Sequence, residues 1–437
     1  MSLKNDFMWV VAAQIIGLLS GLFGLKVLTN LMDTGQFGIY QLGWSVALIF
    51  TTGLFSPFGH AIIRLYPNFA ALFLARDFTY KNVKNLSLLV LVIFIIGLAI
   101  SFALSAFAQV NLLFCIATLF AVLGLGVSLF LQHFQTSQRQ RKTFAISQFF
   151  VSFGRPISAA FAILFFSFSS DQASMALLAS GVYLLLFGFV QFWFVKRGLL
   201  KSEYENQQSE KPDALEIESG KEQIANNSSI LAVAIPMAII GCLTVFSVYI
   251  DRWIMSQMLD VAAVGIYAAM FQISIAPLTF MQGTANRFAL PLIFKNAISS
   301  NSKSERMAAM KNAKKLVWFW GAGITLVVLT AFVAHQLIVQ LLTTPAIAQY
   351  SDLLPILLLG MALEKTAQVI TIKGNTTMQI KRYVPARLLH IIVLLPLGVW
   401  LTSLYGIYGF AFAHVVAGLA ILIATIWVNF KLIKHTI

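Results

Sequence analysis

Long apolar runs recur along the whole chain, and they are continuous rather than alternating. Each is about 20 residues or more, the length that crosses a bilayer as an α-helix. In lipid only helices and closed barrels satisfy their own backbone hydrogen bonds, and continuous runs favour helices. We therefore expect an all-α polytopic membrane protein with twelve spans: 7–31, 37–60, 85–107, 111–134, 144–168, 173–195, 229–251, 262–288, 314–341, 350–372, 383–403 and 405–430.

The polar connections between these runs alternate in charge. All but seven of the 30 Lys and Arg residues lie near the two ends of the chain or in connections that follow even-numbered spans. The connections after odd-numbered spans carry Asp33, Asp171, Asp260 and Asp352. Because basic residues favour the cytoplasmic side of a membrane, this pattern predicts that both termini are cytoplasmic. The net charge of +14 is then a topology signal, and we expect no nucleic-acid partner.

The longest polar stretch divides the chain. It is rich in Glu, Lys, Gln, Asn and Ser, a composition typical of flexible linkers. We expect an N-terminal six-helix bundle at 1–196, a cytoplasmic linker at 197–228 and a C-terminal six-helix bundle at 229–437. Beyond this linker, the connection "SSNSKSERMAAMKNAKKL" is predicted to form a basic amphipathic helix on the inner leaflet.

A short motif occurs at the same place in both halves. "DTGQFGIY" begins at Asp33 and joins the first two spans, and "DVAAVGIY" begins at Asp260 and joins the seventh and eighth. An Asp here can cap the following helix, and the shared glycines, Gly38 and Gly265, allow helices to approach closely. A parallel repeat of this kind predicts two bundles related by an axis along the membrane normal. Transporters bind their substrate in the central cavity of such an arrangement.

Composition excludes most other classes of protein. The chain is 59% hydrophobic and 11% charged, against roughly 25% charged residues in soluble domains, and its mean hydropathy is +0.83. No phosphate-binding glycine loop, nucleophile elbow or zinc-ligand spacing occurs. Cys115 and Cys242 lie in apolar runs. We therefore expect neither an enzyme nor a cofactor, metal site or disulfide, and we expect the first span to be a membrane helix rather than a cleaved signal.

Charged side chains inside the spans are the candidates for function, because a charge near the bilayer centre costs roughly 2.5–3.5 kcal/mol. Two acids lie there, Asp251 and Glu364. The seven bases are Lys26, Arg64, Arg155, Arg252, Arg287, Lys365 and Arg387. The excess of bases predicts an anionic cargo, and Arg binds phosphate oxygens bidentately.

We assign roles to these residues by their depth in the spans. The first six bases are predicted to line a cationic substrate-binding cavity, whereas Arg387, one turn into its span, is interpreted as interfacial. Asp251 and Glu364 are candidates for coupling or for ion pairs, Asp251 with Arg252 or another nearby base. The scattered histidines are interpreted as hydrogen-bonded or interfacial side chains, with a proton relay as the alternative; they are His60, His133, His335, His390 and His414.

Several segments then resemble a known family. "LTNLMDTGQFGIYQLGWSV", "GHAIIRLYP" and "VYIDRWIM" with "VGIYAAMFQISIAP" are similar to bacterial polysaccharide-export flippases of the O-antigen type. These flippases belong to the multidrug/oligosaccharidyl-lipid/polysaccharide superfamily. The resemblance covers the whole chain, and twelve spans rather than fourteen argue against the peptidoglycan-precursor subgroup.

The resemblance implies a V-shaped pair of six-helix bundles in the bacterial inner membrane. It implies that an undecaprenyl-diphosphate-linked oligosaccharide, such as an O-antigen unit of lipopolysaccharide, moves from the cytoplasmic to the periplasmic leaflet through a cationic cavity. The expected partners are this anionic lipid-linked oligosaccharide, membrane lipids and other membrane proteins of polysaccharide assembly.

Two alternatives stay open. A cation-coupled multidrug exporter of the same superfamily would need embedded carboxylates, and only Asp251 and Glu364 are available, each beside a base. A membrane polysaccharide polymerase or ligase generally presents a long periplasmic loop, and every predicted outside loop here is short. The bases therefore favour the flippase.

Overall fold

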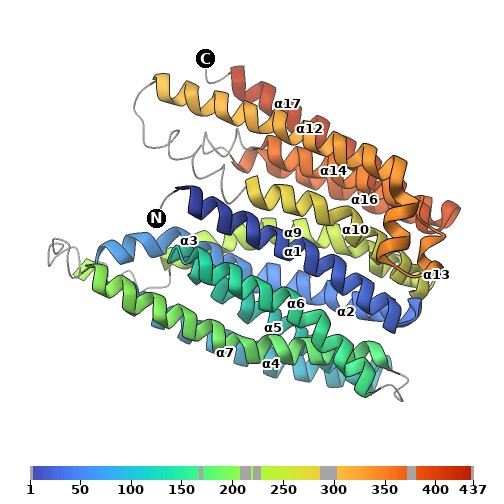
Figure 1. Ribbon diagram of the computed structural model, residues 1–437, viewed down its shortest axis with the longest axis horizontal. Helices are drawn as coiled ribbons and strands as arrows, with labels where there is room; N and C mark the ends of the chain where they lie inside the picture. Colours follow the sequence, from blue (N-terminus) through green and yellow to red (C-terminus); the bar gives the residue numbers. More distant parts are fainter. Residues whose placement is uncertain are drawn as a thin grey trace. The chain divides into compact units, whose positions relative to one another are not determined.

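Twelve helices in the computed structural model are long and apolar enough to cross a membrane (Figure 1). The structure describes residues 3–166, 171–206, 218–219, 228–285, 303–371 and 380–434. Within these ranges the long elements are all helical, so the predicted all-α fold with twelve spans is confirmed. The predicted positions of the termini relative to the membrane remain a prediction.

The described helices follow one another along the chain. They are α1 (Leu3–Leu31), α2 (Thr34–Phe50), the π-helix η1 (Thr51–Phe55), α3 (Ser56–Ala71), α4 (Ala75–Ala108), α5 (Leu112–Ser137), α6 (Arg141–Phe165), α7 (Gln172–Asn206), α9 (Ser228–Met258), α10 (Val261–Thr284), α12 (Lys303–Leu342), α13 (Pro345–Ala348), α14 (Leu353–Ile370), the 3₁₀-helix η3 (Ile380–Tyr383), α16 (Val384–Tyr405) and α17 (Ile407–Lys434). Together α2, η1 and α3 make one span.

Some helices extend well beyond a bilayer core. At about 1.5 Å per residue, the 40 residues of α12 reach about 60 Å, twice the thickness of the hydrocarbon core. Its membrane-spanning part is Lys315–Leu342. The basic segment predicted to be a surface helix is therefore, from Lys303 on, the first part of α12; residues 299–302 lie outside the described ranges. Likewise, 197–206 of the predicted linker continue α7 as helix, whereas 207–217 and 220–227 are outside these ranges.

The chain forms two compact units. Unit 1 contains Met1–Gly38 and Ser247–Ile437, and unit 2 contains Ile39–Phe246. Helix α1 belongs to unit 1 because it packs against α10 and α12, and the Gln272 amide of α10 donates a 2.8 Å hydrogen bond to the Gly21 carbonyl of α1. The predicted halves 1–196 and 229–437 group α1 differently, and they remain a prediction.

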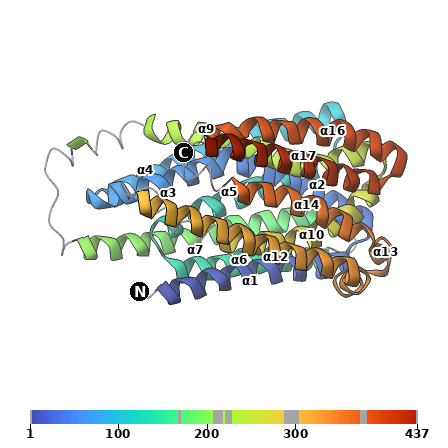
Figure 2. The ribbon, with the colours of Figure 1, turned by 90° about the horizontal axis from the view of Figure 1, so that it is seen from above.

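Unit 2 is built around α5, which packs along α7 and also contacts α3, α4 and α6 (Figure 2). Small residues allow the closest approach: a Cβ on Gly124 would overlap the Gly181 carbonyl of α7, and one on Gly181 would lie 2.5 Å from the Phe120 carbonyl carbon of α5. In unit 1, α17 packs along α14 and α16. These contacts follow the rule that small residues form helix interfaces where hydrocarbon surrounds the protein.

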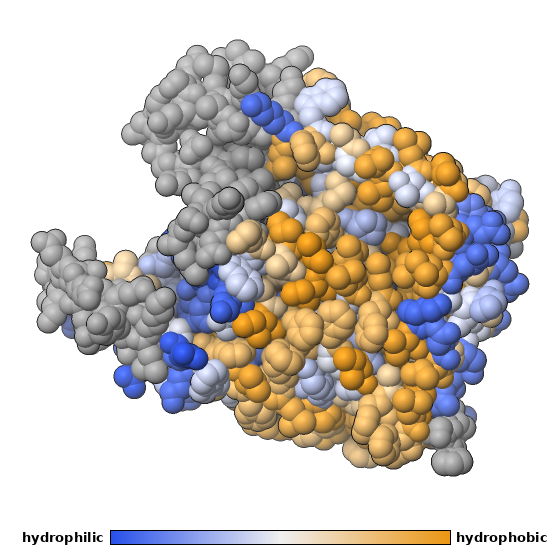
Figure 3. Space-filling view, viewed as in Figure 1, coloured by the Kyte–Doolittle hydropathy of each residue, from blue (hydrophilic) through white to orange (hydrophobic). Residues whose placement is uncertain are grey.

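The outer faces of the helices are apolar. Helices α4 and α12 bury few of their side chains, and Phe319 and Val333 of α12 are more than 80% exposed. Figure 3 shows apolar side chains over the middle of the visible face and hydrophilic ones mainly toward its ends. This distribution matches a surface covered by lipid rather than by water.

The acidic residues of the short connections hold helix ends in place. Asp33 accepts a hydrogen bond from the Gln36 backbone N–H at 2.8 Å, and Asp260 accepts the equivalent bond from Ala263 at 2.6 Å. Each bond joins residues three apart, as expected for a helix cap. The repeated Asp therefore caps its helix in both copies of the motif, as the sequence predicts.

The repeated glycines also contact each other's helices. A Cβ on Gly38 would overlap the backbone carbonyl of Val261, and a Cβ on Gly265 would overlap that of Thr34. Thr34 and Val261 are themselves equivalent positions of the repeat, so each first turn packs against the other in the same way. The glycines are needed at this contact because any side chain would push the two turns apart.

We expect the substitution Gly38→Ala to destabilise the protein, because the added methyl group meets a backbone atom that cannot rotate away. Overpacking of this kind costs about 1–3 kcal/mol. Thermal unfolding of the detergent-purified protein measures the loss, and Gly265→Ala should behave alike. Gly321→Ala in α12 is the matched control. Nothing lies within 4 Å of its Cβ position, so the unfolding temperature should change little or rise. Equal midpoints for Gly38→Ala and Gly321→Ala would contradict the close contact.

Candidate functional site

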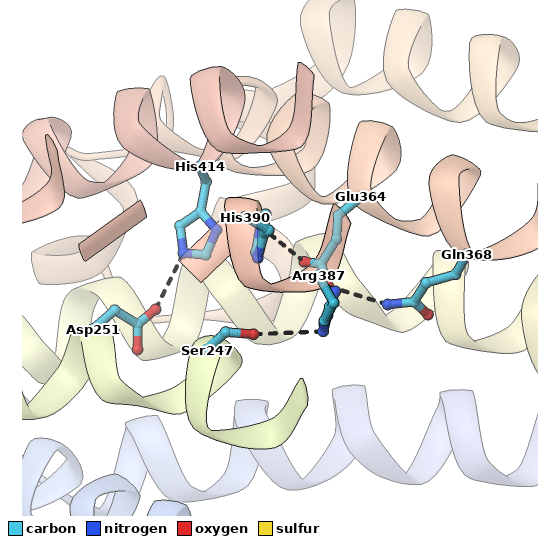
Figure 4. A network of polar contacts seen from close by, with 7 residues as sticks. All are labelled: Ser247, Asp251, Glu364, Gln368, Arg387, His390 and His414. Carbon is cyan, nitrogen blue, oxygen red and sulfur yellow. Dashed lines mark hydrogen bonds and ion pairs between the residues drawn. The ribbon is translucent and has the colours of Figure 1, made fainter. Parts of the chain in front are cut away.

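A cluster of buried polar side chains joins four helices of unit 1 (Figure 4). Spacing along each helix brings the groups together: residues three or four apart share one face. Helix α16 places Arg387 and His390 on such a face, α14 does so with Glu364 and Gln368, and α9 does so with Ser247 and Asp251. His414 comes from α17. The cluster is referred to below as the polar network; it consists of Ser247, Asp251, Glu364, Gln368, Arg387, His390 and His414.

One half of the polar network is an ion pair. The Arg387 Nη1 atom donates to Glu364 Oε1 at 2.7 Å, and the two side chains are 12% and 5% exposed. The Gln368 amide donates to the same carboxylate oxygen at 3.1 Å, and Arg387 Nη2 contacts the Ser247 hydroxyl at 3.4 Å. A buried charge is costly, and an ion pair with further hydrogen bonds of this kind offsets much of that cost.

The other half pairs a carboxylate with an imidazole. His414 Nε2 lies 3.4 Å from Asp251 Oδ2, and both side chains are almost fully buried. The second oxygen of Asp251 accepts a 2.7 Å hydrogen bond from the Arg252 backbone N–H. His390 lies in the same cluster, with its Nε2 atom 4.0 Å from Glu364 Oε2 (Figure 4).

Tight helix packing sets these distances. A Cβ on Gly360 would lie 2.8 Å from the His414 carbonyl carbon, and one on Gly418 would lie 2.6 Å from the Gly360 carbonyl oxygen. Helices α14 and α17 can therefore approach until their backbones touch, which brings His414 into the interior of unit 1. A larger residue at Gly360 would push His414 away from Asp251.

The network corrects two interpretations drawn from the sequence. Arg387 is not interfacial, since its side chain is mostly buried and pairs with Glu364. Asp251 has its side-chain partner on α17, 163 residues away, and not in the neighbouring Arg252. The sequence did carry one indication: two acids inside spans each require a base, and Arg387 and His390 share a helix face.

Arg252 is buried without a carboxylate partner among the described residues. Its guanidinium carbon lies 4.6 Å from the Tyr249 ring centroid and 4.9 Å from that of Phe271. Its Nε atom is buried, and within the described part of the chain no oxygen accepts a hydrogen bond from it. The cation is thus held by aromatic faces, which stabilise a desolvated positive charge without neutralising it.

Arg155, near the middle of α6, is held in a similar way in unit 2. Its guanidinium carbon lies 4.7 Å from the Trp44 ring centroid of α2. Among the described residues no carboxylate pairs with it. Arg155 therefore keeps its positive charge inside a membrane-spanning helix.

The remaining predicted cavity residues have different surroundings. In unit 1, Lys26 donates to the Thr343 carbonyl at 2.9 Å, just after α12 ends, where a cation stabilises the helix terminus. Arg64 is exposed on α3, and Lys365 is half-buried beside Glu364 on α14. Arg287 lies outside the described residues. Within unit 1, the structure thus joins Glu364 and Asp251 to one network.

We expect Glu364→Gln to destabilise the protein, because Arg387 would stay buried without its carboxylate. Removing one partner of a buried pair costs about 3–5 kcal/mol. Thermal unfolding of the purified protein measures the loss. The double variant Glu364→Leu with Arg387→Met serves as the control, since it removes both charges and should recover most of the stability. If Glu364→Gln unfolds at the wild-type temperature, the ion pair does not stabilise this unit.

Solved structures with a similar fold are transporters. A lipid II flippase MurJ structure in an inward closed conformation aligns with TM-score 0.64 and 14% identity, covering 97% of this chain and 87% of that one. A transporter of the MOP superfamily from Pyrococcus furiosus, described by a reversed polarity of its binding pocket, aligns with TM-score 0.65, 12% identity and coverages of 99% and 96%. The Vibrio cholerae MATE transporter VcmN, as an Asp-to-Asn mutant, aligns with TM-score 0.62 and 13% identity, covering 99% of this chain and 98% of that one. At sequence identities this low, the structural similarity establishes the fold alone.

Sequence comparison identifies the family. Comparison with curated proteins gives no significant match. The family model described as polysaccharide biosynthesis protein matches residues 3–297, which is well over half of the chain. This multi-pass membrane chain, with the fold of MOP-superfamily transporters, therefore belongs to the polysaccharide biosynthesis protein family.

Proposed function

We propose that the protein is a flippase. Its substrate is an undecaprenyl-diphosphate-linked oligosaccharide, such as an O-antigen or similar surface polysaccharide unit, which it moves from the cytoplasmic to the periplasmic leaflet of the bacterial inner membrane by alternating access. Family membership supports a role in polysaccharide biosynthesis, and the fold supports transport. A flippase changes the leaflet of its substrate and breaks no bond, so the proposal includes no catalytic residue, metal or cofactor.

The observation that carries the proposal is the state of the interior arginines. Arg155 in unit 2 and Arg252 in unit 1 each rest on aromatic rings, and no carboxylate neutralises them among the described residues. Both carboxylates of the polar network are already paired with other groups. An unneutralised guanidinium inside a membrane protein attracts anions, and it binds diphosphate oxygens in a bidentate manner.

The other predicted bases complete a cationic path in this proposal. Lys26, Lys365, Arg64 and Arg287 would offset the charge of the headgroup at other points of its movement. The polyprenyl tail would stay in the lipid, where it keeps its apolar surface away from water. Other membrane proteins of polysaccharide assembly would deliver the lipid-linked unit and receive it.

We expect Arg155→Gln and Arg252→Gln to reduce export of surface polysaccharide about ten- to a hundredfold at normal protein levels. Each substitution removes hydrogen bonds to a charged group, worth about 1.5–3 kcal/mol. Complementation of a strain that lacks its own polysaccharide flippase measures export. Arg197→Gln is the matched control, because this exposed arginine also lies on an aromatic ring, 5.5 Å from the Trp193 centroid, but near the end of α7. Full export by all three variants would refute the cationic path.

The same strains separate the alternatives. A multidrug exporter would leave polysaccharide unchanged in the two variants while sensitivity to cationic drugs rises. A polymerase or ligase would change the length or linkage of the polymer. If the protein is a flippase, the lipid-linked unit accumulates intact in the cytoplasmic leaflet of the two variants. A sugar-oxidising reagent that does not cross the membrane can measure which leaflet holds the unit.

A further inference from the structure

The repeated motif extends past its tyrosine in both copies. Tyr40 and Tyr267 end the matched stretches, and Trp44 and Phe271 follow them by four residues, so a second ring lies one helical turn further on. The ring centroids of Tyr40 and Trp44 are 6.1 Å apart, and those of Tyr267 and Phe271 are 6.3 Å apart. These two aromatic pairs, Tyr40–Trp44 in unit 2 and Tyr267–Phe271 in unit 1, are equivalent positions of the repeat.

The second ring of each aromatic pair contacts an interior arginine. The guanidinium carbon of Arg155 lies 4.7 Å from the Trp44 ring centroid, and that of Arg252 lies 4.9 Å from the Phe271 centroid. In unit 1 a further ring, Tyr249, lies 4.6 Å from Arg252. Trp44 is 4% and Phe271 is 3% exposed, so little water competes with the rings for the cation. Desolvated contacts of this kind are the strong ones.

The tyrosine of each aromatic pair is connected to the backbone of the same arginine by one polar side chain. In unit 2 the Tyr40 hydroxyl contacts the Ser180 side chain, and the Ser180 hydroxyl donates to the Arg155 carbonyl at 3.1 Å. Tyr40 and Ser180 are both buried. Arg155 is therefore held at two places, at its backbone through Ser180 and at its guanidinium by Trp44.

Unit 1 has the same arrangement with a carboxylate in place of the hydroxyl. Tyr267 lies beside the Asp251 side chain, and Asp251 Oδ1 accepts a hydrogen bond from the Arg252 backbone N–H at 2.7 Å. Phe271 contacts the guanidinium of the same arginine. In both units, then, the tyrosine of the motif supports the backbone of the arginine and the following ring supports its charge.

The arginines themselves are not equivalent positions of the repeat. Arg155 lies in the fifth span, whereas Arg252 lies in the seventh, which repeats the first. At the offset of 227 residues between Asp33 and Asp260, Arg252 corresponds to Leu25. Duplication of the fold therefore does not explain why both aromatic pairs hold an arginine, since each receives it from a different helix. This observation favours a function for the charge itself.

The contact with a ring also leaves the arginine able to bind an anion. An aromatic ring attracts the flat face of a guanidinium, whereas the N–H donors lie in the guanidinium plane and remain available. The Nε atom of Arg252 agrees with this, since no described oxygen accepts a hydrogen bond from it. If the arginines served packing alone, an apolar side chain would fill the space without the cost of burying a charge.

We propose that the two aromatic pairs are positioning residues that hold Arg155 and Arg252 ready to bind the diphosphate of a polyprenyl-linked substrate. This inference rests on the proposed flippase function. Because the rings orient each guanidinium without neutralising it, the arginine can bind phosphate oxygens without first leaving a carboxylate. The repeated motif then supports substrate binding in addition to capping its helices.

The test measures binding of farnesyl diphosphate, a soluble polyprenyl diphosphate, to the purified full-length protein by equilibrium dialysis. Arg155→Gln and Arg252→Gln first define the binding that depends on each arginine. We expect Trp44→Leu to weaken the Arg155-dependent binding about tenfold, because the cation loses the ring that orients it. Trp44→Phe keeps a ring and should restore most of the affinity. Phe271→Leu should weaken the Arg252-dependent binding only about threefold, since the Tyr249 ring remains.

Double variants show whether a ring acts through its arginine. In the Arg155→Gln background, Trp44→Leu should weaken binding no further, whereas in the Arg252→Gln background its full effect should remain. A general loss of structure would weaken binding in both backgrounds alike. Size-exclusion profiles identify any variant that fails to fold. If Trp44→Leu fails, Tyr40→Phe, which removes only a hydroxyl, replaces it in the same backgrounds.

The matched control is Trp193→Leu. Its ring lies 5.5 Å from the guanidinium carbon of the exposed Arg197 near the end of α7, outside the motif. This variant loses the same kind of contact, and it should bind farnesyl diphosphate as wild type does. Weaker binding by Trp193→Leu, to the same degree as by Trp44→Leu, would contradict a special role for the motif.

Two competitors identify the chemistry that the arginines recognise. Inorganic pyrophosphate should displace farnesyl diphosphate, because the two molecules share the diphosphate group. Phosphatidylglycerol has a single phosphodiester and should not displace it at the same concentration. Displacement by phosphatidylglycerol would assign these arginines to ordinary membrane lipid and overturn the inference.

The outcomes separate this inference from the proposed function. If Trp44→Leu binds as wild type does, or weakens binding equally in both arginine backgrounds, the ring does not position Arg155. The inference is then overturned, and the flippase function still stands on the export measured for the arginine variants. If binding responds as expected but both arginine variants export polysaccharide fully, the positioning role stands and the flippase function fails.

Discussion

A charge inside a membrane-spanning helix must find its partner within the protein, because hydrocarbon offers none. The core of unit 1 depends on this constraint. Glu364 and Asp251 come from different helices, and each has its partner on another helix again, Arg387 on α16 and His414 on α17. Four helices are thereby required to pack in one arrangement, since any other would leave a buried charge alone.

Small residues make that arrangement possible. Gly360 and Gly418 let α14 and α17 touch along their backbones, and this contact carries His414 to Asp251. Close packing at glycines, Gly38 and Gly265, likewise joins the first turns of α2 and α10. Van der Waals contact and charge pairing are thus coupled in this protein: the first sets the distances at which the second can operate.

The interior charges fall into two groups with different physical properties. In the polar network of unit 1, acids meet bases or imidazoles, so net charge is small and helices are held together. Arg155 and Arg252 instead lie on aromatic rings and keep their charge. The first group holds helices together, and the second leaves positive charge that attracts anions.

The sequence by itself determined the architecture. Twelve apolar runs, alternating loop charges and a repeated motif follow from local requirements of a bilayer: length, hydrophobicity and capped turns act within one segment and are visible in it. Asp33, Asp260, Gly38 and Gly265 were assigned correctly for this reason. The list of interior charges was also available, because every charge within an apolar run is conspicuous.

Only the tertiary structure decided which of those charges meet. Arg387 lies one turn into its span, where a cation can reach the membrane surface or turn inward, and the difference depends on Glu364 of another helix. His414 is one of several scattered histidines until packing at Gly360 places it beside Asp251. Pairing energies depend on distances between segments far apart in the chain, and helix packing sets those distances. Hydrophobicity and residue spacing within one segment do not determine these distances.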